Sequence, residues 1–235
     1  MRADRNDAMR AGCYVRPVNF FGHATVATWS DAPAATYVIG AMLPDFASIC
    51  GARSLTASEP EVARGIALHH RTDEVFHAAP SFVALMIDAR ERFAHAGLPN
   101  GAARAASHIG VELLLDGTLV DDAHVGRVYI DAIESLRVEH LVFSGADHAE
   151  RFWHFHGRAR GYGVPHSYVD PAFVAERIAG ALAGRPRLAL GDSPVSDVAR
   201  VLRVMQPIIV ARAAALLDEV RSGLATHADV ALATK

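Results

Sequence analysis

The 235-residue chain has few of the features that mark secreted, membrane-spanning or nucleic-acid-binding proteins. It has only two cysteines, Cys13 and Cys50, which excludes the disulfide framework of a small secreted domain and fits a reducing cytoplasm best. It has no block rich in Lys or Arg, and its net charge is only −3, which disfavours electrostatic capture of nucleic acid. We therefore expect a cytoplasmic protein with no nucleic-acid partner.

Long apolar runs are also missing. The most apolar stretch, residues 201–217, is interrupted by Pro207 and by charged side chains, which predicts a kinked packing helix and no membrane span. The first 17 residues mix Arg, Asp and Asn and lack the apolar core of a signal peptide. We expect a loose tail at residues 1–17 and a single helical domain at residues 18–235.

Strict alternation rich in Val, Ile and Thr, which is typical of β-strands, is scarce, whereas segments with helical apolar spacing alternate with Gly and Pro. We therefore predict an all-α protein, a multi-helix bundle. Ser58 followed by Glu61 resembles a capping box, and Pro80 and the pair Asp170-Pro171 mark the starts of two other helices. The predicted helices span residues 34–47, 59–77, 81–96, 101–119, 123–141, 147–158, 171–183 and 196–222.

Histidine is abundant, with 13 residues, and several histidines lie four residues from another metal-ligating side chain. His69, Asp73 and His77 would fan across about 80° of one helix face, which is close enough to converge on a cation. His70 and Glu74 form an overlapping pair with the same spacing, and either register can include His77. The spacing alone leaves both registers open, together with the alternative of a solvated polar face.

A second pair with this spacing is His108 and Glu112, in a segment that is otherwise small and apolar. An ionised Glu112 on a buried face needs a compensating partner. That partner is either a metal ion or His108 itself, in an internal hydrogen-bonded pair. Asp116 extends the same face by one turn, or caps the end of its helix before Gly117.

Two further candidate ligands, His23 and Asp45, stand alone in the sequence, and Asp45 after Pro44 also fits an N-cap or a turn. A mixed imidazole and carboxylate shell suits manganese, iron or zinc, with magnesium as an alternative. One or two such ions would polarise a phosphoryl oxygen and acidify water, so no covalent nucleophile is needed. We find no Gly-x-Ser-x-Gly or phosphate-loop pattern. The sequence therefore predicts a protein that uses metal ions to hydrolyse a phosphate ester.

Three segments in order resemble the acyl-carrier-protein phosphodiesterase family, relatives of the HD-like metal phosphohydrolases. They are Asn19 to His23, which reads Asn-Phe-Phe-Gly-His, then Gly40 to Phe46, and then Gly65 to Pro80. The resemblance extends over roughly residues 19–190. It implies an HD-domain-like helical fold and release of 4'-phosphopantetheine from holo acyl carrier protein by metal-activated water.

The resemblance also implies roles for individual residues. It assigns metal binding to His69 and Asp73, in preference to the overlapping register, and a phosphate contact to Arg71, so these three are the predicted catalytic residues. The chain departs from the family pattern at His77, where the family has Asp, and at the His108 pair, where it has two Asp residues. The added imidazoles favour a softer metal. The complete predicted metal set is His23, Asp45, His69, Asp73, His77, His108 and Glu112.

The predicted substrate contacts are His70, Arg71, Arg158 and Arg160, because arginine can hold a phosphate through forked hydrogen bonds. Residues 152–166 combine aromatic, His and Arg side chains, which fits a substrate mouth or an aromatic core face followed by a polar loop. Two other functions stay open. One is hydrolysis of a nucleotide or phospholipid, as in zinc-dependent phospholipase C, and the other is non-catalytic ligand binding. The sequence carries no signal for the oligomeric state.

Overall fold

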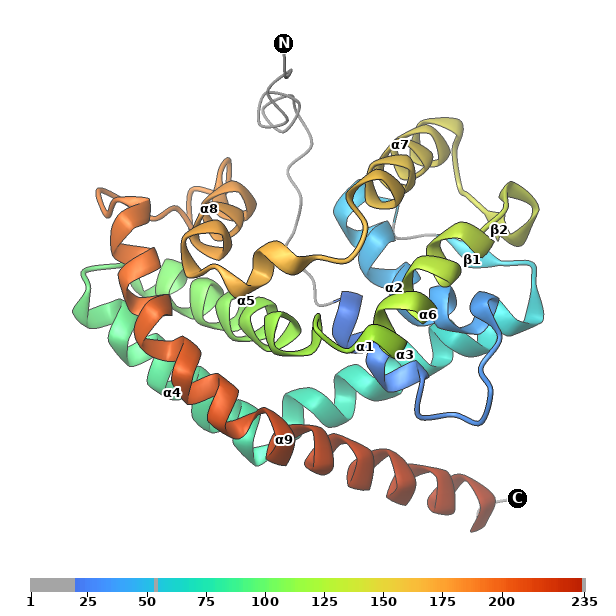
Figure 1. The fold of residues 1–235 in the computed structure, drawn as a ribbon. Helices are drawn as coiled ribbons and strands as arrows, with labels where there is room; N and C mark the ends of the chain where they lie inside the picture. The colour runs from blue at the N-terminus through green and yellow to red at the C-terminus, as the bar shows by residue number, and fades with distance from the viewer. Residues whose placement is uncertain (1–19, 53–54, 234–235) are drawn as a thin grey trace.

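The computed structural model describes residues 20–52 and 55–233, so the predicted tail, together with Cys13 and Asn19, lies outside the described residues. The described chain forms nine α-helices and one two-stranded sheet, which confirms the all-α prediction (Figure 1). The α-helices are α1 (Phe20–Ala27), α2 (Ala35–Cys50), α3 (Pro60–Ala78), α4 (Pro80–His95), α5 (Asn100–Leu119), α6 (Ala123–Ser135), α7 (Ala146–Tyr162), α8 (Pro171–Leu182) and α9 (Val195–Ala233). The short elements are β1 (Thr56–Ala57), β2 (Leu141–Val142) and the 3-10 helices η2 (Val138–His140) and η3 (His166–Val169).

The helix predicted over residues 123–141 is too long. α6 ends at Ser135 because Leu136 adopts extended backbone, and the chain continues through η2 into β2, which pairs antiparallel with β1. The capping box predicted at Ser58 is also wrong. The side chain of Glu59 accepts the N–H of Val62 at 2.6 Å and caps α3, while the hydroxyl of Ser58 donates to the carbonyl of Glu139.

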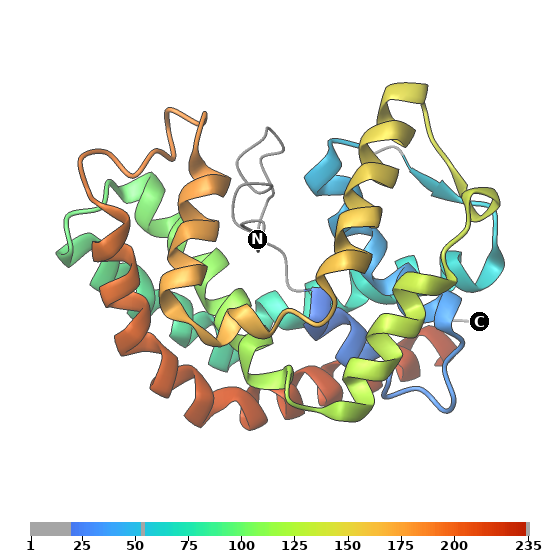
Figure 2. The same ribbon diagram turned by 45° about the horizontal axis from the view of Figure 1, so that its top comes forward.

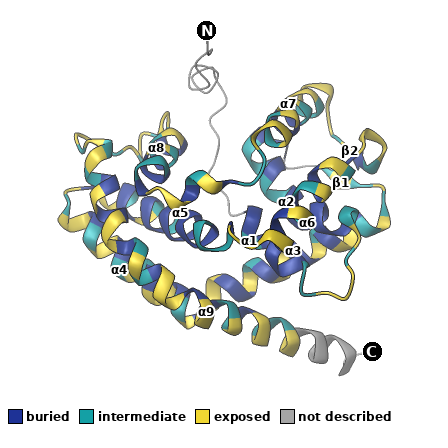
Figure 3. Ribbon diagram, in the orientation of Figure 1, coloured by how far each residue is buried: buried dark blue, intermediate teal, exposed yellow. Residues whose placement is uncertain are grey.

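The helix α1 is missing from the prediction. Seven of its eight residues are buried, and it contacts α2, α3, α5 and α6 at the centre of the molecule (Figure 3). A short helix that is buried on nearly all sides has no polar face, so the apolar spacing that identifies a surface helix is absent. The missing helix matters for the site because α1 carries His23, a predicted metal ligand.

The helices α2 and α3 pack very closely at two glycines. A Cβ atom on Gly65 would lie 2.1 Å from the carbonyl oxygen of Tyr37, and one on Gly40 would lie 2.9 Å from the Cα of Gly65. No larger residue fits at this crossing without moving backbone. The close approach brings the ring of His69 to the α2 backbone, where its Nδ1 lies 2.9 Å from the carbonyl oxygen of Ala41.

One continuous hydrophobic core connects the helices. The long helix α9 contacts α3, α4, α5 and α8 and curves along one side of the molecule, with Pro207 inside it (Figure 1). The helices α7 and α8 stand on either side of η3 (Figure 2). Among the described residues, none of the helices combines the length and apolarity that a bilayer crossing requires.

Candidate metal centre

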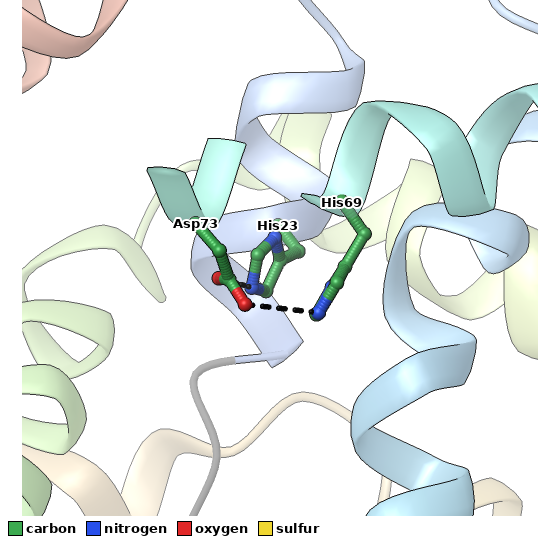
Figure 4. A group of neighbouring side chains, drawn as sticks. All are labelled: His23, His69 and Asp73. Carbon is green, nitrogen blue, oxygen red and sulfur yellow. Dashed lines mark ion pairs between the residues drawn. The ribbon is translucent and has the colours of Figure 1, made fainter. Parts of the chain in front are cut away.

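The four-residue spacing on α3 places His69 and Asp73 on the side of the helix that faces α1 (Figure 4). The carboxylate of Asp73 lies between two imidazoles. Its Oδ1 is 3.3 Å from Nε2 of His23, and its Oδ2 is 3.2 Å from Nε2 of His69. The two rings stack with centroids 4.1 Å apart. These three residues could hold a metal ion, because their ligand atoms all lie within 4.8 Å of one another.

Asp45, near the end of α2, lies beside this group. Its Oδ2 lies 3.7 Å from Nε2 of His23, and its Oδ1 lies 4.0 Å from Nε2 of His69. Two atoms bound to one ion at about 2.1 Å each lie no more than about 4.2 Å apart. Each of the four nitrogen-to-oxygen distances is within this limit, whereas the ligand atoms that all lie within 4.8 Å of one another belong to His23, His69 and Asp73 alone. We call His23, Asp45, His69 and Asp73 the first cluster.

The first cluster contains buried polar atoms that lack hydrogen-bond partners in the described part of the chain. These are both ring nitrogens of His23 and Oδ2 of Asp45, although Nε2 of His23 lies at ion-pair distance from Asp73. His69 differs, because its Nδ1–H donates to the carbonyl of Ala41 and leaves Nε2 directed at the carboxylates. This backbone contact is the usual way in which a metal-ligating histidine is oriented. The donor set therefore fits a divalent metal.

Burial and mutual contacts shift the titration of all four residues. Burial raises the pKa of Asp45 to about 8, although His69 opposes the shift. Burial lowers the pKa of His23, and Asp73 opposes this. For His69 burial alone would lower the pKa, but Asp73 and Asp45 raise it overall, and for Asp73 the two histidines outweigh burial and hold the pKa well below its usual range. Metal and protons therefore compete for this cluster.

A second cluster joins His77, one turn further along α3, to His108 and Glu112 on α5. Oε1 of Glu112 is 2.9 Å from Nε2 of His108 and 3.3 Å from Nε2 of His77. Burial alone would raise the pKa of Glu112, but the two histidines lower it overall, and Glu112 in turn raises the pKa of His108. These ligand atoms also lie within 4.8 Å of one another. Among the described residues, no buried atom of this cluster lacks a hydrogen-bond partner, so the second cluster needs an ion less than the first does.

Asp116 has a role that the sequence did not reveal. α5 continues to Leu119, so Asp116 does not cap the end of its own helix. Its carboxylate instead accepts the backbone N–H groups of Phe21 and Gly22, at 3.1 and 2.8 Å, and thereby caps the start of α1. Burial raises the pKa of Asp116 well above its usual value, and the two N–H groups oppose the shift. Asp116 therefore fixes the position of the helix that carries His23.

The other predicted residues do not join either cluster. His70, Arg71 and Glu74 are exposed on α3, so the overlapping register of His70 and Glu74 does not join either cluster. Arg158 is half-buried on α7 and lines a cavity, whereas Arg160, two residues further on, is exposed and does not line it. The aromatic part of the segment 152–166 contributes three buried side chains: Phe152, Phe155 and His156.

Both clusters are partly open to solvent, and α3 contributes an accessible side chain to each. The exposed side of the first is formed by Asp73, whose side chain is 38% accessible, while His23 is almost fully enclosed. The second opens through His77 and His108. No protein-family model, curated protein or solved structure matches the chain.

Proposed function

We propose that this protein hydrolyses phosphate esters, phosphodiesters in particular, with the help of one or two divalent metal ions. The observation that supports this most directly is that two buried atoms, Nε2 of His23 and Oδ2 of Asp45, form no hydrogen bond with the described residues and meet neighbouring charges only at 3.3 to 3.7 Å. A buried polar atom without a partner costs about 1 to 3 kcal/mol. A cation would remove that cost, whereas a purely structural role would leave it in place.

The first cluster would hold one ion and the second cluster another. When bound, a divalent cation supplies a Lewis acid that polarises a phosphoryl oxygen and lowers the pKa of water toward roughly 7. The imidazole and carboxylate donors favour manganese, iron or zinc over magnesium. His23 and Asp45 enclose the inner side of the first cluster and exclude solvent there.

A substrate would approach from the exposed side, where Asp73, His77 and His108 border solvent. Burial raises the pKa of the Asp45 carboxyl group to about 8, so metal binding would release a proton from it at neutral pH. Exposed Arg71 and His70 are the proposed contacts to the phosphate group, because a guanidinium forms charge-assisted hydrogen bonds with phosphate oxygens.

The proposed substrate is holo acyl carrier protein. We also propose that the chain is related to the HD-like metal phosphohydrolases. Both proposals are supported by the order in which the motifs around His23, Asp45 and His69 occur in the sequence. An arginine-bearing entrance would meet the acidic surface of a carrier protein, so their association should weaken as salt is added. Nucleotide and phospholipid phosphate esters are the alternative substrates for the same two clusters.

Metal analysis paired with hydrolysis of bis(p-nitrophenyl) phosphate tests the proposal. We expect purified protein to bind at least one divalent ion tightly, and Asp73→Asn to lower both metal affinity and kcat/KM by at least about 100-fold. The matched control is Glu74→Gln, an exposed neighbour outside both clusters, which should match the wild type. Absence of bound metal under every loading condition, or equal behaviour of the two variants, would contradict the proposal.

A further inference from the structure

A cavity of about 100 Å³ lies between α1, α6, α7, η3 and α8, and no residue of either cluster lines it. It forms near η3, where α7 and α8 stand on either side (Figure 2). Two arginines, Arg158 and Arg177, face an otherwise mainly aromatic wall. The aromatic side chains are Phe20, Tyr129, Phe155, Tyr162, Tyr168 and Phe173.

The two arginines are positive charges without a protein counter-charge. Within residues 20–52 and 55–233, neither Arg158 nor Arg177 forms an ion pair with a carboxylate or stacks on an aromatic ring. Both are half-buried. A partly desolvated guanidinium is stabilised by an oxyanion, whose geometry matches its forked donors. The positive charges of the two arginines at this cavity therefore favour an anionic ligand.

The size and lining of the cavity define the rest of that ligand. A cavity of roughly 150 Å³ holds benzene, so this one would hold most of an aromatic ring or a short alkyl chain. It opens toward solvent beside Tyr162, which is 45% exposed. Burial raises the pKa of Tyr168 to about 12, with Arg177 opposing the shift, so its hydroxyl stays protonated and can donate a hydrogen bond.

We propose that this cavity is a binding site for a small ligand that joins an aromatic or short alkyl body to an oxyanion. The body lies among the aromatic rings, and the oxyanion is held by Arg158 and Arg177. Pockets of this composition, mostly apolar with a few convergent polar groups, are typical ligand sites. The site is distinct from the metal clusters, although Phe20 in its wall lies on the same helix as His23.

The test measures binding of phenylphosphonate to the full-length protein by calorimetry after removal of metal with a chelator. Without metal, binding of the phosphonate cannot come from ions in the two clusters, so the result does not depend on the proposed hydrolysis. Two control ligands each carry one part of the proposed ligand. Inorganic phosphate carries only the oxyanion, and benzyl alcohol carries only the aromatic body. We expect phenylphosphonate to bind at least about 10-fold more tightly than either. Equal affinity for all three, or no binding of phenylphosphonate, would overturn the proposal.

Three variants locate the site. Arg158→Gln and Arg177→Gln should each weaken phenylphosphonate binding by at least about 10-fold, because each removes a charge-assisted contact. Arg160→Gln removes the same charge from the same helix outside the cavity and should leave the affinity within about 2-fold of wild type. Circular dichroism checks that each variant is folded. Equal effects of the Arg158 and Arg160 changes would contradict the assignment.

Discussion

Three buried histidines differ in what holds their rings. His69 and His156 each point one ring nitrogen at a backbone carbonyl, of Ala41 and Ile133 respectively, at 2.9 Å. His23 has no such contact on either nitrogen among the described residues. A buried imidazole is stable when its polar atoms are satisfied. The hydrogen bond of His156 explains it as a structural residue, whereas a bound ligand would satisfy the ring nitrogens of His23.

We predict that His156 makes the fold less stable in acid. Burial lowers its pKa, Arg160 and Arg137 act in the same direction, and the hydrogen bond to Ile133 opposes them. Because the folded pKa lies below the unfolded value of 6.5, the unfolded state binds the proton first. The stability contributed by this group is therefore complete above pH 6.5 and falls as the pH drops below that value.

Urea unfolding at pH 7.5 and pH 5 checks this expectation. His156→Gln keeps a donor for the Ile133 carbonyl but cannot titrate, so its free energy of unfolding should fall less between the two pH values than that of the wild type. His154→Gln, an exposed change on the same helix, should retain the wild-type fall. An equal fall in wild type and His156→Gln would rule out this role.

At the scale of the elements, the first cluster depends on the crossing of α2 and α3. Their close approach at Gly40 and Gly65 sets the distance between Asp45 and His69, which lie on the two helices. A methyl group at Gly65 would meet backbone, which cannot rotate away as a flexible side chain can. The glycines are therefore part of what positions the ligands.

We predict that Gly65→Ala destabilises the fold by about 3 kcal/mol and weakens metal binding, because the helices must move apart. Gly157→Ala is the matched control. This glycine lies inside α7, and a Cβ atom added to it would meet nothing within 4 Å, so alanine should stabilise the fold by about 0.5 to 1 kcal/mol. Denaturant unfolding and metal titration of both variants measure the difference. A neutral Gly65→Ala would show that the crossing tolerates a larger separation.

A second element-scale prediction concerns the start of α1. Asp116→Ala would leave the buried N–H of Phe21 and that of Gly22 without their acceptor, so we expect a loss of about 2 kcal/mol and a lower metal affinity. Asp122→Ala removes an ordinary N-cap of α6 and should cost about 1 kcal/mol without affecting metal binding. If both variants bind metal equally well, α1 does not need this cap to present His23.

On the scale of the whole molecule, the first cluster joins three helices that are distant in sequence. His23 lies on α1, Asp45 on α2, and His69 and Asp73 on α3. An ion bound to all three would stabilise the folded state relative to the unfolded chain, in which these residues are far apart. The size of this stabilisation depends on the free metal concentration relative to the dissociation constant.

We predict that manganese or zinc at 100 times its dissociation constant stabilises the protein by about 2.7 kcal/mol and raises Tm, and that a chelator reverses the change. Asp45→Asn should strongly reduce the rise in Tm that metal causes. His108→Ala should preserve the share of that rise that comes from metal bound at the first cluster. Differential scanning calorimetry with and without metal measures both. An unchanged Tm in wild type at saturating metal would argue against a site that joins the three helices.

The sequence alone determined the features that depend on local order. The apolar spacing identified the helices α2 to α5, α7 and α8 close to their observed positions, because the period of an amphipathic helix is present in the chain itself. It also identified the start of α9, but that helix continues to Ala233, well beyond the predicted end at residue 222. The presence of His69 and Asp73 on one helix face follows from the same local geometry. The long helix predicted after residue 123 failed because pairing of β2 with β1 is a contact between distant segments.

Only the tertiary structure decided which of these side chains meet. It selected the register of His69 and Asp73, and it added His23 from a helix without amphipathic pattern. It also divided the predicted ligands into two clusters and assigned Asp116 to a cap 94 residues away in sequence. The physical reason is that spacing within one helix is set by local backbone geometry, whereas convergence of ligands on α1, α2, α3 and α5 depends on how the buried faces of those helices pack.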